Sequence, residues 1–197
     1  MDTTNISRPR GRPRRFDADQ AVATAQRLFH ARGYDAVSIA DLTKALGINP
    51  PSFYAAFGSK AGLYARVLSR YGDTAAIPLD DILRPDRPVA DALAALLEAA
   101  ARYYAADPDA TGCLVLEGLQ CNDPEARQAT RAANVAAEDV IRRYIANRHP
   151  EEAERLADFV CTIMTGLSAK ARNGQGLNRL VATAHLAGPV LAQMLRA

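Results

Sequence analysis

Five arginines crowd one short segment of the chain, RPRGRPRR at residues 8–15. Guanidinium groups bind phosphates, and they favour the narrow minor groove of A·T-rich DNA, where negative potential is concentrated. The segment also lacks the apolar periodicity of a folded element. It is therefore a candidate arm for contact with a polyanion, and the elements that follow must position it.

Positive charge is confined to the first part of the chain. Residues 1–72 carry eleven Lys and Arg against five Asp and Glu, a net charge of +6. The other residues carry thirteen against seventeen, so the whole 197-residue chain has a formal charge of only +2. We expect the N-terminal part alone to contact a polyanion.

The residue patterns of enzymes are missing. His30, His149 and His185 are far apart in the sequence and lie in no metal-ligand or triad motif. A glycine-rich phosphate loop is not found either. We expect no catalytic residue, no metal and no cofactor.

The sequence predicts a cytoplasmic chain. No apolar run approaches the ~20 residues that a membrane-spanning helix needs, and the basic N-terminus lacks the apolar stretch of a secretory signal. The cysteines are Cys113, Cys121 and Cys161, an odd number without a CxxC pair, which is typical of a reduced protein.

The composition predicts an all-α fold. Alanine and leucine are abundant, Trp is absent, and no segment alternates as a strand does. The first predicted helix begins at Asp17, which can cap it, and ends at Gly33. In the last one, over residues 177–196, Pro189 should introduce a kink or a break.

Residues 38–57 carry the signals of a helix-turn-helix. Ser38 can cap one short helix, and Asn49 can cap a second after a Gly-containing turn. Phe53 and Phe57, four positions apart, supply the buried face of the second helix.

We divide the chain into an arm at 1–15, a three-helix DNA-binding domain at 16–72, a connector at 73–87 and a C-terminal helical domain at 88–197.

The sequence of residues 17–68 resembles the N-terminal DNA-binding domain of the TetR family of bacterial transcriptional regulators. The resemblance depends on LFHARGYDAVSIADLTKALGI and PPSFYAAFGSKAGLY, and on their order and spacing. It implies that the second short helix enters the major groove. Tyr54, Lys60 and the helix start at Ser38 are then expected to contact phosphates.

Two positions depart from the usual pattern of that family. Gly62 stands where an acidic residue commonly follows the Ser-Lys pair, and Pro50 and Pro51 stand where many relatives have polar side chains. Few long donors are left to read bases. Sequence readout is therefore expected from Asn49, Ser52, apolar contacts with thymine methyl groups, and the arm.

Within the arm, the RGRP core of residues 10–13 matches an AT-hook, in which glycine lets the backbone approach the groove floor. A merely solvated basic tail is the alternative interpretation. The minor-groove hypothesis involves five candidate residues: Arg8, Arg10, Arg12, Arg14 and Arg15.

The resemblance implies that the C-terminal helices bind a small-molecule effector and pair two subunits. Small residues interleaved with large apolar ones let helices approach closely, as in a bundle across a two-fold axis. The candidate dimer residues are Ile163, Gly166, Leu167, Leu180, Val181, Ala184, Ala187 and Leu191. Packing of these faces inside one subunit is the alternative. The candidate pocket residues are Tyr103, Tyr104, Glu117, Gln120, Cys121, Phe159 and Met164.

The resulting hypothesis is a homodimeric, ligand-responsive regulator, a repressor that leaves a palindromic operator when its effector binds. An effector-independent architectural DNA-binding protein is the alternative hypothesis. The sequence specifies neither the effector nor the operator.

Overall fold

The structure is a computed structural model that describes residues 17–195, where every regular element is a helix. The predicted arm lies outside the described residues. Within them, no helix combines the length and hydropathy that crossing a membrane requires. The elements are α1 (Ala18–Arg32), α2 (Ile39–Leu46), α3 (Pro50–Phe57), α4 (Lys60–Thr74), α5 (Leu79–Ile82), α6 (Val89–Tyr104), α7 (Leu114–Gly118), α8 (Pro124–Ala146), the 3-10 helix η1 (Pro150–Glu152), α9 (Ala153–Arg172), α10 (Leu177–His185) and α11 (Ala187–Met194).

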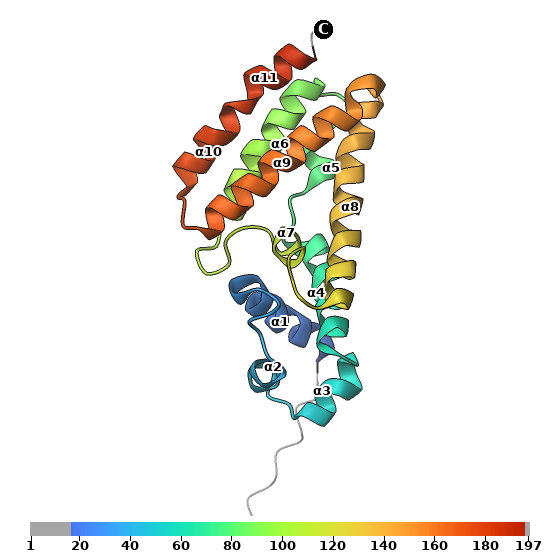
Figure 1. The fold of residues 1–197 in the computed structure, drawn as a ribbon, viewed down its shortest axis with the longest axis vertical. Coiled ribbons are helices and arrows are strands. Elements are labelled where there is room, and N and C mark those ends of the chain that lie inside the picture. The colour runs from blue at the N-terminus through green and yellow to red at the C-terminus, as the bar shows by residue number, and fades with distance from the viewer. Residues whose placement is uncertain (1–16, 196–197) are drawn as a thin grey trace, which may run out of the picture.

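The helices form an elongated molecule with two ends (Figure 1). Helices α1 to α4 occupy one end, and α6 and α8 to α11 pack as a bundle toward the other. Short α7 lies between them, and α8 runs alongside α4 as well as the bundle. The predicted all-α class is confirmed, with a helix-turn-helix before a helical C-terminal part.

The predicted helix boundaries are largely those observed. The Asp17 carboxylate accepts hydrogen bonds from the amides of Asp19 and Gln20 at 3.0 and 3.1 Å, so it caps α1. Helix α1 stops at Gly33, whose φ of +77° is in the left-handed region that favours glycine. The last predicted helix is broken near Pro189, because α10 ends at His185 and α11 follows.

Two apolar clusters stabilise the molecule. The first lies among α1 to α4, around the fully buried Phe29, Phe53 and Tyr64. It also takes in Leu114 of α7 and Ala126 of α8, so the N-terminal core is completed by residues far along the chain. The second cluster fills the C-terminal bundle between α6, α8, α9, α10 and α11.

The segment predicted as a connector is partly helical. Helix α4 continues to Thr74, and α5 follows within the predicted linker. Leu83 after it is buried against the C-terminal core. The Tyr144 hydroxyl of α8 donates to the carbonyl oxygen of Arg84 at 3.0 Å, which fixes the segment against the bundle.

Candidate DNA-binding surface and effector cavity

The helix-turn-helix is built by local signals. A glycine with φ of +66°, Gly47, ends α2, and Asn49 starts α3 by accepting from the amide of Ser52 at 2.9 Å. Phe53 and Phe57 are buried, with ring centroids 5.4 Å apart. They anchor α3 on the core and leave its opposite side in solvent.

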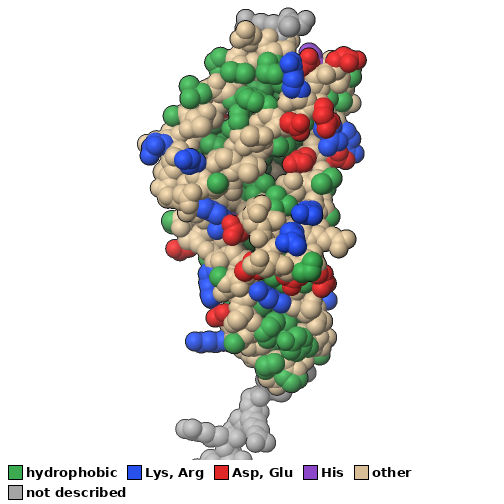
Figure 2. All heavy atoms as spheres, viewed as in Figure 1, with side chains coloured by type: hydrophobic (Ala, Val, Ile, Leu, Met, Phe, Trp, Pro, Cys, Tyr) green, Lys and Arg blue, Asp and Glu red, His purple; other side chains and the backbone are tan. Residues whose placement is uncertain are grey.

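The exposed side of α3 carries the residues expected to meet DNA. Asn49, Pro50, Pro51 and Ser52 are all exposed at its N-terminus. Tyr54 is 50% exposed although it neighbours two core phenylalanines, so its hydroxyl is available to a partner. Figure 2 shows apolar side chains gathered at the end of the molecule where α3 lies, with acidic groups farther along. A surface of this kind can fit between phosphates without electrostatic repulsion.

Ser38 is placed differently from the expectation that its side chain holds a phosphate. Its hydroxyl accepts from the amide of Asp41 at 3.1 Å and donates to the Asp41 carboxylate at 2.6 Å. The hydrogen bonds that the Asp41 carboxylate accepts from the Ser38 hydroxyl and the Ser38 amide, together with the nearby Arg32 guanidinium, lower the pKa of Asp41 to about 2. The hydroxyl is therefore engaged in a capping box, and the first-turn amides of Ile39 and Ala40 are the groups that remain for an anion.

Lys60, the other expected phosphate contact, lies over an aromatic ring. Its Nζ is 4.0 Å from the centroid of Tyr34. Partial burial lowers the pKa of this ammonium, while Asp35 and Asp123 act in the opposite direction. The Tyr34 hydroxyl in turn donates to Asp123 at 2.7 Å, so the ring beneath the Lys60 ammonium is tied to the residue that caps α8.

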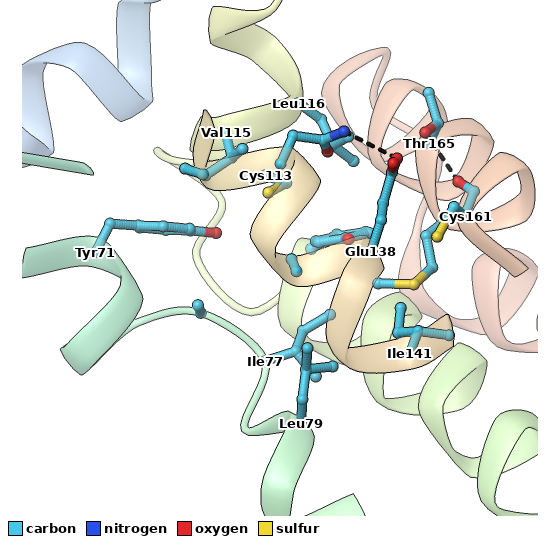
Figure 3. Close-up of a pocket in the computed structure, with 16 residues that line it drawn as sticks. Tyr71, Ile77, Leu79, Cys113, Val115, Leu116, Glu138, Ile141, Cys161 and Thr165 are labelled. Carbon is cyan, nitrogen blue, oxygen red and sulfur yellow. Dashed lines mark hydrogen bonds between the residues drawn. The ribbon is translucent and has the colours of Figure 1, made fainter. Parts of the chain in front are cut away.

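A cavity of about 130 Å³ opens where α4 to α9 meet (Figure 3). Its walls are mainly apolar, with aromatic rings and sulfur atoms. The lining residues are Tyr71, Ala76, Ile77, Leu79, Tyr104, Cys113, Val115, Leu116, Ala133, Asn134, Ala137, Glu138, Ile141, Cys161, Met164 and Thr165.

Two of the residues expected in the pocket, Tyr104 and Met164, line this cavity. The other five lie elsewhere in the structure. Tyr103 is 43% exposed, Gln120 is exposed, Cys121 is buried in the N-terminal core, Phe159 packs against the C-terminal core outside the lining, and Glu117 forms an ion pair with Arg172. Tyr104 is the one aromatic residue of the predicted set that lines the cavity, because the side of each helix that faces the void depends on its rotation in the bundle.

Tyr71, Asn134 and Glu138 also line the cavity, although none of them is among the predicted pocket residues. The missed signal is the helical register of α8, where Asn134 and Glu138 lie four residues apart beside the apolar positions Ala133 and Ala137. Asn134 Nδ2 donates to Glu138 Oε1 at 2.8 Å. Two polar residues along the edge of an apolar stripe are a recognisable sign of a polar group facing a cavity.

Burial disfavours the thiolate form of all three cysteines, of which Cys113 and Cys161 line the cavity. Desolvation raises the pKa of Cys113 and of Cys121, and it raises that of Cys161 to about 12. Because the thiolate is the reactive form, these cysteines act as small hydrophobic residues.

A polar cluster joins the cavity region to α1. His30 Nε2 donates to the carbonyl oxygen of Gly112 at 3.1 Å, since a carbonyl only accepts. Arg172 Nη2 donates to the carbonyl oxygen of His30 at 3.1 Å, and its Nε forms an ion pair with Glu117 at 3.1 Å. We call His30, Gly112, Glu117 and Arg172 the junction cluster. It ties the ends of α1 and α9 to α7.

The residues expected at a dimer interface fall into two groups. Five are buried inside the protomer and are unavailable to a partner: Leu167, Leu180, Ala184, Ala187 and Leu191. Ile163 and Val181 are half-buried against the same core, and Gly166 is exposed with no atom within 4 Å of a Cβ built on it. At these five positions, the alternation of small and large apolar residues therefore reflects packing of α9, α10 and α11 on α6 within one chain.

The same helices expose other apolar residues, namely Leu177, Leu186 and Val190, which are 39%, 76% and 42% exposed. Such side chains on neighbouring helices are a candidate interface.

Known proteins resemble this chain in sequence and in fold. The profile described as "Bacterial regulatory proteins, tetR family" matches residues 21–67. The chain is 53% identical over 195 residues to the HTH-type transcriptional repressor BdcR of Escherichia coli (strain K12), and the match covers 99% of each protein. It is 30% identical over 190 residues to the repressor ComR of the same strain, with 91% of this chain and 90% of ComR covered.

A solved structure agrees with this assignment. A cysteine mutant of the TetR family regulator CifR, complexed with 26-bp double-strand operator DNA, matches with a TM-score of 0.77 and 33% identity. The match covers 90% of this chain and 98% of that one. The chain belongs to the TetR family of bacterial transcriptional regulators.

Proposed function

We propose that the protein is a homodimeric transcriptional repressor that leaves a palindromic operator when a small-molecule effector fills the cavity. The observation that carries this proposal is the double role of α4. Its first residue, Lys60, lies next to α3, and Tyr71 near its other end lines the cavity. One 15-residue helix thus touches both sites.

The DNA-binding domain of each subunit, formed by α1 to α4 and called the head below, is proposed to place α3 in the major groove. The Tyr54 hydroxyl would donate to a phosphate, and the amides of Ile39 and Ala40 would hold another. Lys60 is proposed to reach a third phosphate from its place over the Tyr34 ring, since an ammonium has three N–H donors and the ring face leaves others free. Asn49, Pro50, Pro51 and Ser52 are proposed to face the bases. This assignment is supported by their exposure.

The arginine arm is proposed to add minor-groove contacts beside each head. Its place directly before the helix-turn-helix domain supports this assignment. A dimer is proposed through the outer faces of α9, α10 and α11, where Gly166, Leu177, Leu186 and Val190 are exposed. Two heads about one helical turn apart would then read a two-fold symmetric site.

Release is proposed to follow from a shift of α4. Tyr71 lines the cavity and also lies edge-on to His30 of α1, with ring centroids 5.5 Å apart. An effector that displaces Tyr71 would therefore act on α4 and on the junction cluster together. A state in which the heads no longer fit two successive major grooves would lose DNA affinity.

The experiment that tests this proposal has two steps. Selection of bound sequences from a random DNA pool gives the operator, and a metabolite screen against the bound complex then looks for release. We expect a symmetric consensus and at least one releasing compound that also raises the melting temperature. Binding to bulk DNA without sequence preference, together with no stabilising compound, would favour the architectural alternative.

A further inference from the structure

We propose that the cavity selects a small organic cation, an alkylammonium-type ligand, through the carboxylate of Glu138. This inference rests on the proposed function, because it names the ligand class of the same cavity. Glu138 is the only Asp, Glu, Lys, Arg or His among the residues that line the cavity. A lone carboxylate in an apolar wall favours a ligand of opposite charge.

One oxygen of the Glu138 carboxylate makes no hydrogen bond or ion pair with the described residues. Its Oε1 accepts from Asn134 Nδ2, drawn as a dashed line in Figure 3, and no hydrogen bond or ion pair within residues 17–195 engages Oε2. The nearby guanidinium of Arg142, one turn along α8, is occupied by ion pairs with Asp139 and Glu154. The charges of Arg142 and Glu138 attract each other, but the direct contacts of the guanidinium go to Asp139 and Glu154, so a ligand ammonium can still approach Oε2 of Glu138.

The remaining walls also suit a cation with alkyl groups. Tyr71 and Tyr104 bring two aromatic rings from opposite elements, and an aromatic face attracts ammonium. Figure 3 shows Tyr71 reaching across from α4 toward Cys113. Around these rings, Ile141 and Met164 offer apolar contacts for the alkyl part.

The cavity volume limits the size of the ligand. About 130 Å³ is close to the roughly 150 Å³ of a dry protein cavity that holds benzene. We therefore infer a ligand of about five to seven non-hydrogen atoms. The three probes tert-butylammonium, tert-butanol and pivalate share one alkyl shape and differ in charge.

Methionine methyl NMR can test this inference on the full-length protein. The chain has three methionines, and Met164 lines the cavity while Met194 lies in α11 outside the lining. We expect tert-butylammonium to shift the Met164 methyl signal, with Kd about tenfold below that of tert-butanol, and to leave Met194 unchanged. Pivalate should not bind.

Two isosteric variants identify the source of charge selectivity. Glu138→Gln should remove the preference, so that the ammonium and the alcohol bind within about threefold of each other. Glu125→Gln removes the same charge from the exposed start of α8 and should preserve the preference. Equal binding of the alcohol and the ammonium to the unmodified protein would overturn the inference, as would a preference that survives in Glu138→Gln or no Met164 shift with any probe.

DNA release measured on the same samples separates the two proposals. If tert-butylammonium binds with the expected preference but operator DNA stays bound, cation selectivity stands and effector-driven release fails for this cavity. If tert-butanol or another neutral compound binds best and releases DNA, the proposed function stands and the cation inference fails.

Discussion

At the scale of single residues, the exposed positions of the N-terminal helices decide which groups can meet DNA. Tyr54 turns outward because Phe53 and Phe57 already occupy the buried side of α3. Ser38 shows the opposite outcome, since its hydroxyl is consumed by the capping box with Asp41. The chemical type of a side chain therefore does not by itself single out a candidate DNA contact. Its exposure and its local hydrogen bonds must be considered as well.

Removing the Tyr54 hydroxyl should weaken DNA binding without disturbing the fold. We expect Tyr54→Phe to lower operator affinity about 10- to 150-fold, the loss of one hydrogen bond to a charged group, with an unchanged melting temperature. Fluorescence anisotropy with labelled operator measures the change. Tyr103→Phe removes a hydroxyl from a similarly exposed tyrosine of α6 and should bind normally. Equal affinities of the two variants would contradict the assignment.

The burial of His30 should make stability depend on pH. Desolvation lowers its pKa below the ordinary value of 6.5, so the unfolded chain binds more protons between the two pKa values. Its contribution to the free energy of unfolding is therefore present above about pH 6.5 and is lost as the pH falls through its folded pKa. His30→Gln, which keeps a donor for Gly112, should flatten urea-derived stability between about pH 7.5 and 5.5. His149→Gln should keep the slope, and an unchanged slope in His30→Gln would refute the assignment.

At the scale of elements, close packing of α7 holds the two ends of the molecule together. A Cβ on Gly118 would lie 2.3 Å from the Tyr64 hydroxyl oxygen and 2.8 Å from Thr130 Oγ1. Only glycine lets α7 approach α4 and α8 this closely. Because Cys113 and Leu116 beside it line the cavity, this packing also sets the shape of the ligand site.

A methyl group at position 118 should therefore be destabilising. We expect Gly118→Ala to lower the free energy of unfolding by about 1–3 kcal/mol through overpacking. Gly72→Ala is the matched control, because that glycine lies in α4 with nothing within 4 Å of its Cβ position. It should gain about 0.5–1 kcal/mol from helix propensity. Chemical denaturation compares the two variants, and a Gly118→Ala protein as stable as the unmodified one or as the control would contradict this packing.

The arm is an element whose contribution can be measured apart from the fold. If about four of its arginines neutralise phosphates, deletion of residues 1–15 should reduce the log–log salt slope of DNA binding by roughly 3 to 4. Affinity for A·T-flanked operators should fall more than affinity for G·C-flanked ones. An unchanged slope after deletion would show that the arm takes no part in binding.

The helices could be predicted from the sequence much better than the cavity. Caps such as Asp17 and Asn49, and stops such as Gly33 and Gly47, act through neighbours in the chain, so local reasoning finds them. The cavity forms where α4 to α9 meet, and its lining depends on the rotation of each helix. Local patterns could not place Glu117 in an ion pair with Arg172, 55 positions later, or separate exposed from buried faces on α9 to α11.

At the scale of the whole molecule, the proposed repression involves two copies of the chain, and the exposed Gly166 offers a selective test of their pairing. Gly166 has free space around it within the protomer, so a large side chain there should leave the fold intact. We expect Gly166→Arg to shift the mass measured by sedimentation toward the monomer and to weaken operator binding about tenfold or more.

The control for this pairing test is Gln128→Arg, which adds the same side chain to an exposed site on α8. It should remain dimeric. A dimeric Gly166→Arg variant with normal operator affinity would place the interface elsewhere.

The central claim is that two copies of α3 occupy successive major grooves of one operator. Hydroxyl-radical footprinting of the operator, with the unmodified protein and with Tyr54→Phe, tests it most directly. The account predicts two protected backbone segments related by two-fold symmetry, about 10–10.5 bp apart between centres, each with weaker protection at a phosphate in the variant. A single or continuous footprint, or a pattern that Tyr54→Phe leaves unchanged, would contradict it.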